Sequence, residues 1–520
     1  MNTFDRILAG ISPQRAVKRQ MARKQLEILN TGYSNSGASK SKKSMIGWTF
    51  KGGSSKEDID DNLSVLRERS RDLYMNTPIA TGALKTIRTN VIGAGLRLNA
   101  QIDFEYLGMT EEEADVWETN VEREFSLWSE TILCDSMQMN NFYELQQIAF
   151  LSFLMSGESF VTLPYIERKG TPYGLKVQLI EADRIMSPTG INHKIISGVE
   201  VGNYGEVVAY HVAQFHPLSN GVSEKKWLRI EKFGKESGRQ NILHLMEAER
   251  PEQRRGTPLL SPVIESIKQL GRYSDAELMA ALISSMYTVF IKSENPGDSP
   301  LGEVIPDNQR VDDADENSYE LGSGAIIGLA ENESIEVANP GRNNSSFDAF
   351  VTAICRQIGS AIEVPYELLL KHFTSSYSAS RAALLESWKM FRSRRAWVAA
   401  RFCQPIYEEF LNEAISSGRI NAPGFFDDPI IRKAYAGAEW NGPSQGQIDP
   451  LKEVNAAAKR VEEGFSTRSR ETTELTGGDY WKNTRQRVRE EQSRREGGLI
   501  LNEKQTVLEV QKSSDELDDE

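Results

Sequence analysis

Two long runs of helical periodicity on either side of a polar insertion constrain this chain most. Pro262–Ile291 repeats apolar side chains at helical spacing, which predicts a helix of about 30 residues and about 45 Å. A second helix is predicted over Phe347–Glu363, ending before Pro365. The segment between them, Asn295–Arg342, is rich in Gly, Asp and Asn. Two short strands are expected in it, Ala325–Leu329 and Ser334–Ala338. Compact enzymes rarely contain two long helices that flank a small β-containing insertion.

The rest of the chain predicts further helices around a β-rich layer. From Ser159 to Leu245 the apolar period changes to two, which predicts strands separated by turns. Helices are predicted at Ile59–Asn76, Pro78–Asn90, Glu111–Ser129, Asn141–Ser156 and Ser378–Ser417. The last of these is expected to break near Pro405. The predicted fold class is therefore α+β and mostly helical.

The charge of this 520-residue chain is unevenly spread. The net charge is −13, yet residues 1–51 carry ten Lys/Arg and two Asp/Glu, a net of +8. The end of the chain, Leu499–Glu520, has seven acids and two bases. Basic arms often meet nucleic acid or an acidic partner, but polar, disordered termini are the more common explanation for such ends. Within the arm, helices are expected at residues 3–11 and Gln14–Leu29, followed by a flexible linker at Thr31–Ser44.

Signatures of catalysis, metal binding and membrane insertion are weak. Val91–Leu96 (VIGAGL) lacks the third glycine of a dinucleotide-binding turn, so a strand kink is the simpler interpretation. The five histidines show no metal-ligand spacing, and the three cysteines are far apart, so no cofactor is predicted. The longest uncharged apolar stretch, Leu278–Ile291, has fourteen residues, fewer than the roughly 20 that span a bilayer. No membrane span is expected.

A basic stretch with interleaved aromatic residues is the strongest candidate for contact with nucleic acid. Lys371–Arg401 holds seven bases and a single acid, Glu386, and it includes Trp388, Phe391 and Trp397. Such a helix can contact phosphates. Equally, the aromatic residues can form its core face while the bases pair with acids of a neighbouring subunit. The candidate residues for either role are Arg381, Lys389, Arg392, Arg394 and Arg395.

Several runs of this sequence together resemble one family. They are RSRDLYMNTPIATGALKTIRTNVIGAGLRL (69–98), VEREFSLW (121–128), LIEADRI (179–185), HLMEAERPEQRRGTPLLSPVIESIKQLGRYSDAELMAAL (244–282) and AEWNGPSQGQIDPLKEVNAAAKRVEEGFSTRSRE (438–471). In this combination the chain resembles the lambda-type family of tailed-phage portal proteins, the head–tail connectors. The resemblance is collinear from Asp58 to about Gly498 and does not cover the N-terminal arm.

The resemblance implies a non-enzymatic ring, typically of twelve subunits, at one vertex of a capsid. Double-stranded DNA would enter and leave through its central channel. The terminase large subunit would dock during packaging, and head-completion or adaptor proteins would follow. The ring would also contact the major capsid protein, sit in the virion and be assembled in the host cytoplasm. A net negative charge suits a channel, because each cationic contact with phosphate adds affinity and slows sliding.

The family architecture also implies a division of the chain. Residues 1–51 would be a flexible basic arm, 52–260 the wing, 261–291 and 346–363 the two stem helices, 292–345 the clip, 364–377 the tunnel loop, 378–450 the long wing helix with a return to the wing, and 451–520 a helical crown with an acidic tail. By order along the chain, the DNA-facing tunnel-loop residues would be Lys371, His372, Phe373 and Thr374. The packing residues of the first stem helix would be Ile267, Leu270, Leu278, Leu282 and Met286.

Two other functions remain open from the residues alone. One is an enzyme that binds a nucleotide at the Val91–Leu96 turn, which a thermal-shift screen with nucleotides would detect. The other is a free nucleic-acid-binding protein that works through the basic arm, whose binding would depend steeply on salt.

Overall fold

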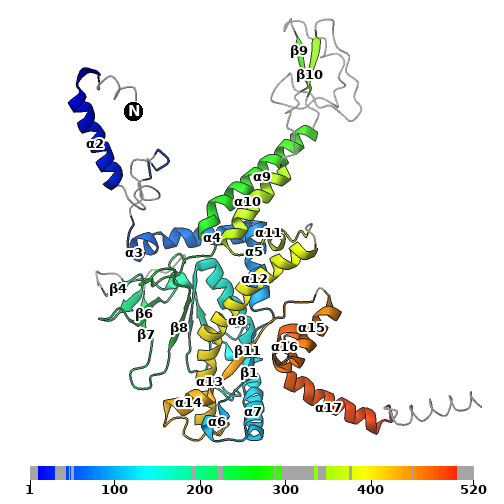
Figure 1. Ribbon diagram of the computed structural model, residues 1–520. Coiled ribbons are helices and arrows are strands. Elements are labelled where there is room, and N and C mark those ends of the chain that lie inside the picture. Colours follow the sequence, from blue (N-terminus) through cyan, green and yellow to red (C-terminus); the bar gives the residue numbers. More distant parts are fainter. Residues whose placement is uncertain are drawn as a thin grey trace, which may run out of the picture. The chain divides into compact units, whose positions relative to one another are not determined.

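The computed structural model describes most of the chain (Figure 1). The described residues are 10–29, 43–45, 47–48, 52–188, 194–219, 226–285, 289–293, 333–337, 347–373, 377–447 and 449–499. They divide into two units, Met1–Asp58 and Ile59–Glu520, each of which is described by itself.

The first unit contains two helices, α2 (Pro13–Leu29) and α3 (Ser55–Asp58). The helix predicted at Gln14–Leu29 is confirmed as α2. Its apolar residues Val17 and Met21 are exposed within the unit. The expectations for residues 3–11 and for Thr31–Ser44 lie largely outside the described residues.

Four helices at the start of the second unit follow the predicted ranges closely. They are α4 (Leu63–Asn76), α5 (Pro78–Val91), α7 (Glu111–Ser129) and α8 (Phe142–Ser156), and a short α6 (Phe104–Leu107) precedes α7. Local chemistry explains the boundaries. Both α7 and α8 begin with a capping box, Thr110 with Glu113 and Asn141 with Glu144. Helix α8 ends at Gly157, whose φ of 85° is left-handed.

The β-rich layer predicted between Ser159 and Leu245 is present as two antiparallel sheets. The three-stranded sheet has the order β3-β2-β8, with β2 at Glu158–Thr162, β3 at Gln178–Ile180 and β8 at Ile242–Met246. The four-stranded sheet runs β4 (Ile195–Ile196), β5 (Val199–Val201), β6 (Val207–Ala213) and β7 (Trp227–Glu231). Every residue of β2 is buried, and side chains from both sheets share a small apolar core.

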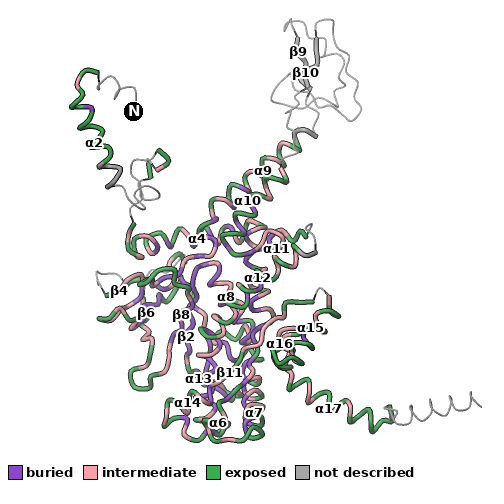
Figure 2. Tube along the Cα trace, viewed as in Figure 1, coloured by how far each residue is buried: buried purple, intermediate pink, exposed green. Residues whose placement is uncertain are grey.

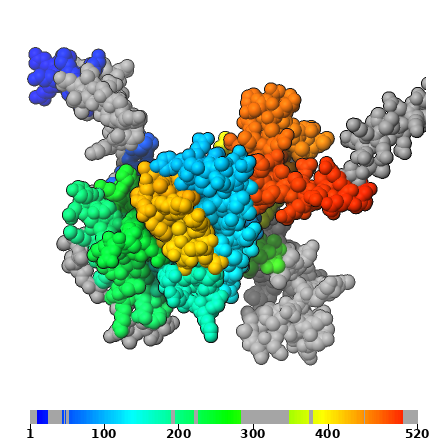
Figure 3. Space-filling view, turned by 90° about the horizontal axis from the view of Figure 1, so that it is seen from below, coloured from blue at the N-terminus to red at the C-terminus, as the bar shows by residue number. Residues whose placement is uncertain are grey.

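Residues near 438 return to the N-terminal half of the unit. Strand β1 (Arg97–Ala100) pairs antiparallel with β11 (Ala438–Asn441), and α14 (Pro429–Tyr435) contacts α6. In Figure 3 the gold segment around α14 lies beside the blue segment that contains α6 and α7. The ion pair between Arg419, just before α14, and Glu124 on α7 is 2.8 Å long. The pairing of β1 with β11 links positions more than 300 residues apart.

A carboxylate on α7 supports this junction and should make stability depend on pH. Glu118 accepts a hydrogen bond from the Ile102 amide at 2.8 Å, and burial raises the pKa of Glu118 to about 7. Because the folded state then binds more protons than the unfolded state, this group's contribution to stability falls as pH rises from 4.5 to 7. We expect Glu118→Gln to raise the melting temperature at pH 8 and to change it little near pH 4.5. Thermal unfolding of both proteins across this range tests this, with the exposed Glu112→Gln as control. An equal change at every pH would contradict it.

The two long helices that flank the insertion are α9 (Ile264–Ser285) and α10 (Phe347–Ala361). They pack together, with the Tyr273 ring 5.5 Å from Phe347 and 4.8 Å from Phe350. The predicted extension of the first helix to Ile291 is wrong, because β9 (Val289–Ser293) pairs antiparallel with β10 (Glu333–Val337). β-branched and aromatic residues favour a strand there, although their apolar spacing also fits a helix. The predicted strand Ser334–Ala338 corresponds to β10, and Ala325–Leu329 lies outside the described residues.

The helix predicted at Ser378–Ser417 is broken where expected. Helix α12 (Tyr377–Val398) passes through a π-helical turn, Ala399–Cys403, into α13 (Gln404–Ser416). Pro405 explains the break, because it donates no amide hydrogen bond and its ring collides with the carbonyl four residues earlier. Before α12, the segment predicted as a loop contains a short helix, α11 (Tyr366–Leu370).

One apolar core holds α5, α7, α8, α10, α12 and α13 together. Phe125 lies at its centre, with its ring edge-on to the rings of Phe142, Tyr407, Phe410 and Trp440. Figure 2 shows buried positions concentrated in α8, β2 and β8. Among the described residues, no helix has both the length and the apolarity needed to cross a bilayer.

Three helices follow at the end of the described chain, α15 (Pro450–Glu462), α16 (Arg468–Thr476) and α17 (Tyr480–Glu496). Helix α17 has no buried residue and is held against α7 by ion pairs. Lys482 lies 2.7 Å from Glu122, and Arg485 lies 3.2 Å from Asp115. Exposed ion pairs contribute little stability each, so this attachment is weak.

Candidate functional site around the α11 turn

The residues predicted to face DNA lie on a turn that protrudes at the end of α11. Lys371 caps this helix with a left-handed φ of 53°, and the His372 amide donates to the Glu367 carbonyl at 3.0 Å. The side chains of Lys371, His372 and Phe373 are all exposed. Thr374 lies outside the described residues. The turn thus presents a cation, an imidazole and an aromatic ring next to each other.

A tight connection between α10 and α11 fixes the position of this turn. The Val364 amide donates to the Gly359 carbonyl at 2.9 Å, and Pro365 immediately precedes α11. A Cβ on Gly359 would lie closer than 3.0 Å to the Val364 carbonyl oxygen, which no side chain tolerates. Glycine is therefore required at 359 for α11 to fold back against the base of the helical pair.

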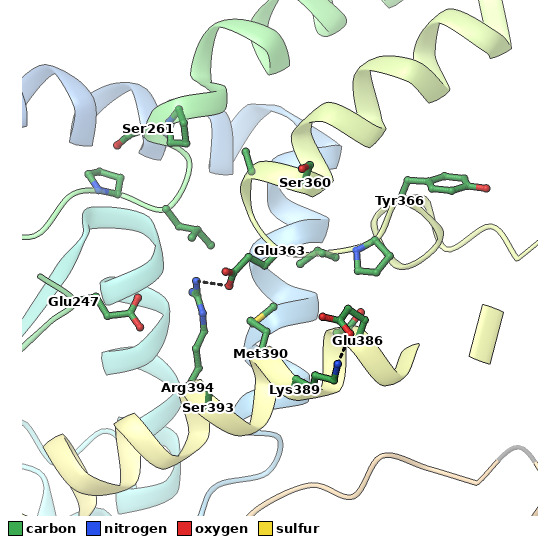
Figure 4. A pocket seen from close by; sticks show the side chains of 18 of the residues that line it. Glu247, Ser261, Ser360, Glu363, Tyr366, Glu386, Lys389, Met390, Ser393 and Arg394 are labelled. Carbon is green, nitrogen blue, oxygen red and sulfur yellow. Dashed lines mark hydrogen bonds and ion pairs between the residues drawn. The ribbon is translucent and has the colours of Figure 1, made fainter. Parts of the chain in front are cut away.

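A large open pocket of about 1490 Å³ lies between this connection, the start of α9 and α12 (Figure 4). Glu363 and Arg394 point toward each other across it, 3.7 Å apart, and Lys389 lies 2.6 Å from Glu386. Arg394 is only 7% exposed, and its Nη1 has no hydrogen-bond partner. The pocket lies at the base of the helical pair and holds charges of both signs.

The basic stretch on α12 is engaged mainly inside the subunit. Three of its candidate side chains meet acids: Arg381 lies 3.7 Å from Glu453, Lys389 meets Glu386, and Arg392 lies 3.3 Å from Glu474. The aromatic residues Trp388 and Phe391 are buried in the core. This arrangement corresponds to the core-face interpretation, with acids of the same subunit as partners.

Two of the five candidate basic residues, Arg394 and Arg395, are engaged inside the single chain. Arg394 is buried against the pocket, and Arg395 donates to the backbone carbonyls of Val91 at 3.1 Å and Asn90 at 3.0 Å. Arg395 also lies over the Trp388 ring, and burial lowers its pKa to about 10. Arg395 therefore caps the C-terminal end of α5.

The apolar stripe on α9 divides into a covered half and an open half. Ile267 and Leu270 are buried in the core, whereas Leu278 is 61% exposed and Leu282 is 45% exposed. Met286 lies outside the described residues. In a single chain, α10 therefore does not cover the distal part of the stripe.

A buried charge cluster behind these helices was not found from the sequence. Glu158 on β2 is fully buried and contacts Arg67 on α4, Arg255 and His244. The Arg255 Nε lies 2.8 Å from Glu158 Oε1, and the His244 Nε2 lies 2.8 Å from Oε2. The only sequence signal was the run 244–282, which contains two of the partners and contributes to the family resemblance. Arg67 and Glu158 are 91 residues apart, so no local pattern joins them.

The charges in this cluster set its protonation. Burial alone would raise the pKa of Glu158, but Arg255, Arg67 and His244 outweigh it and hold that pKa well below its ordinary value. Burial lowers the pKa of His244, against the opposing effect of Glu158. The cluster is therefore an ionised carboxylate held between two guanidinium groups, and it ties α4 to strands β2 and β8 of the three-stranded sheet.

The alternative nucleotide site at Val91–Leu96 has no room for a ligand. The Leu96 amide donates to Gln146 Oε1 at 2.6 Å, and the Gln146 amide group donates back to the Leu96 carbonyl at 3.1 Å. A Cβ on Gly95 would overlap Tyr143. The turn is a packed kink that leads into β1. Among the described residues, no group of three or more His, Cys, Asp or Glu side chains could hold a metal ion.

Comparison with known proteins gives the family. Residues 41–395, more than half of the chain, match the sequence model of the phage portal proteins of the lambda family. The chain belongs to this family. The portal protein B of Escherichia phage lambda is 26% identical over 452 residues, which cover 83% of this chain and 84% of that protein. The portal protein of Escherichia phage N15 is 25% identical over 474 residues, which cover 87% of this chain and 88% of that protein.

Chains in solved structures of gene transfer agent particles also align with this chain. A chain of the neck of a native gene transfer agent particle, computed with C12 symmetry, aligns with a TM-score of 0.46 and 13% identity, over 80% of this chain and 93% of that one. A chain of the neck of an empty particle aligns with a TM-score of 0.48 and 14% identity, over 80% and 94%.

Membership of the portal family gives this chain its general role. It is a structural, non-enzymatic component of the phage head, located in the virion at the head–tail connector. Portal proteins form ring oligomers that associate with the capsid.

Proposed function

We propose that twelve copies of this chain close into a ring whose central channel carries double-stranded DNA during packaging and ejection. The observation that carries this proposal is the exposed distal part of α9, where the Leu278 side chain is 61% exposed in the single chain. A closed ring needs a head-to-tail contact between different surfaces of adjacent subunits. A long helix that gives one face to α10 leaves another face for the next copy.

The same proposal assigns roles to the parts of the subunit. Helices α9 and α10 are the stem, and residues 292–345 between them are the clip, which docks the terminase large subunit and later the head-completion proteins. Residues 52–260 and 378–450 form the wing, and 451–520 form the crown. The ring assembles in the host cytoplasm and meets the major capsid protein at one vertex.

The exposed turn after α11 is the tunnel loop in this proposal. Lys371 and His372 have no acidic side-chain partner among the described residues, so both are available to phosphates. Only a few cations reach the channel in a chain of net charge −13, which keeps the grip on DNA weak enough for sliding. The N-terminal arm, 1–51, lies outside the channel in this proposal and contacts capsid or scaffold.

Native mass spectrometry tests the ring directly. We expect a closed oligomer of roughly 700 kDa, twelve times the chain mass of 58.4 kDa. Leu278→Glu should shift the population toward smaller species, because it places a charge in the contact between copies. The matched control is Leu228→Glu on β7, whose side chain is 64% exposed and which should leave the ring intact. A stable monomer of the unmodified chain at micromolar concentration would contradict the proposal.

A further inference from the structure

A second hollow lies beside the α11 turn, against the open face of α5. Its volume is about 750 Å³. It is lined by Met75, Asn76, Thr77, Pro78, Thr81, Gly82, Lys85, Thr86, Thr89, Asn90, Leu368, Lys371 and Phe373. We call it the α5 groove. None of these lining residues is acidic, although the whole chain has 74 Asp and Glu against 61 Lys and Arg.

The α5 groove presents cationic and hydroxyl groups and no acidic side chain. Lys85 and Thr89 are exposed and lie one helical turn apart on the same face of α5, and Lys371 faces the groove from the α11 turn. Neither lysine has an acidic partner among the described residues. Residues 374–376, which follow the turn, are Thr, Ser and Ser, so the sequence brings no acid next to it either. Lysine side chains and hydroxyl groups are among the groups that contact phosphate oxygens of a nucleic-acid backbone.

Gly82 is an independent observation that points to a ligand. It lies in the interior of α5, where glycine costs roughly 0.5–1 kcal/mol relative to alanine. A Cβ built on Gly82 meets no atom within 4 Å, so packing inside the subunit does not require glycine. The missing side chain instead keeps the floor of the groove low, so that an external group can approach the helix closely.

We propose that the α5 groove receives the phosphodiester backbone of the duplex that passes through the ring. Lys85 and Lys371 contact phosphates from opposite sides of the groove, and Thr89 donates from its hydroxyl group. This inference rests on the proposed function, and it adds α5 to the tunnel loop as a DNA-contacting surface. Lys85, Gly82 and Thr89 span about 10 Å along the helix, which is the axial length of about three phosphates of one strand.

Site-specific photocrosslinking in the full ring tests the contact. The three native cysteines are fully buried, so a cysteine introduced on the surface can be labelled selectively. Lys85→Cys and Lys371→Cys are each labelled with an azidophenacyl photocrosslinker and irradiated with a linear DNA duplex in the channel. The matched control is Lys235→Cys, in the β-rich layer, where Lys235 is 82% exposed. We expect DNA adducts from positions 85 and 371 and none from position 235.

The outcomes separate this inference from the proposed function. DNA adducts from position 371 alone would overturn the proposal that DNA occupies the α5 groove, and would remain in agreement with DNA in the channel. No adduct from either position would contradict the channel itself. Protein–protein adducts between copies from position 85 would show that a neighbouring subunit fills the groove, and would also overturn the inference.

Filling the groove gives a second measurement. Gly82→Leu places a bulky side chain in the open space, and we expect it to lower the DNA adduct yield from position 85 several-fold. The ring mass, measured as above, should not change, and Gly82→Ala should lower the yield by a smaller factor because one methyl group fills less of the space. An unchanged yield in Gly82→Leu, with the ring intact, would contradict close approach of the DNA backbone.

Discussion

Replacing Glu158 by Gln is expected to lower the free energy of unfolding by about 3–5 kcal/mol, the range found when one partner of a buried ion pair is removed. Glutamine keeps the size of the side chain but removes the charge between Arg67 and Arg255, which are 4% and 2% exposed. The buried Arg255 would then lose its ion-pair partner, and Arg67 would keep only the more distant Asp183, 3.9 Å away. The Gly256 amide, which donates to Glu158 Oε2 at 3.0 Å, would lose a charged acceptor as well.

Chemical denaturation at pH 7 measures this loss. The control is Glu231→Gln, which removes a carboxylate that pairs with Arg229 at the surface and should change stability very little. Because the pKa of Glu158 is held below its ordinary 4.5 in the fold, its contribution is present above pH 4.5 and is lost as the pH falls further. The difference between wild type and variant should therefore shrink in acid. A loss as small as that of Glu231→Gln would refute the structural role of the cluster.

Replacing Gly256 by Ala is the second change with a large expected effect. A Cβ at this position would lie closer than 3.0 Å to the carbonyl oxygen of Gly157, and a Cβ on Gly157 would overlap the backbone of Gly256 and Thr257. Neither clash can be relieved by rotating a side chain, because in each case the added Cβ meets backbone atoms of the facing segment. We expect a loss at or above the upper end of the about 1–3 kcal/mol that overpacking usually costs.

Thermal unfolding compares this variant with Gly271→Ala. Gly271 lies within α9, where a Cβ meets no atom within 4 Å, so alanine should be neutral or slightly stabilising. Gly256→Ala should melt at a clearly lower temperature, and it should also loosen Glu158, whose carboxylate the Gly256 amide contacts. Equal melting temperatures for the two variants would show that the start of β2 and the loop 250–257 can move apart without loss of stability.

Local patterns were sufficient for most of the long helices of the second unit. The ranges of α7 and α8 followed from apolar spacing, and the structure shows capping boxes at Thr110 and Asn141 where they begin. The break at Pro405 followed from the chemistry of one residue. The end of α9 was misjudged, because Val289–Ser293 has apolar spacing that suits a helix or a strand. Its pairing with Glu333–Val337, forty residues later, decided the outcome.

The functional residues also divide into those identified from the sequence and those whose surroundings only the fold shows. Lys371 and His372 were placed on an exposed turn by their order along the chain, and they are exposed in the structure. Arg394 and Arg395 carry the same charge as Arg392, and only the fold shows that they are buried. Lys85 was not singled out, because one lysine on a threonine-rich helix is unremarkable until Lys371 is brought opposite it.

The sequence by itself determined the fold class, the order of the elements and the portal family, because these depend on residues close together in the chain and on collinear runs. The tertiary structure alone decided which charges are buried, which apolar side chains on α9 remain open and which residues line the α5 groove. These properties depend on contacts between segments that are 90 to 300 residues apart. The packing of the folded chain, and not any local spacing, brings such residues together.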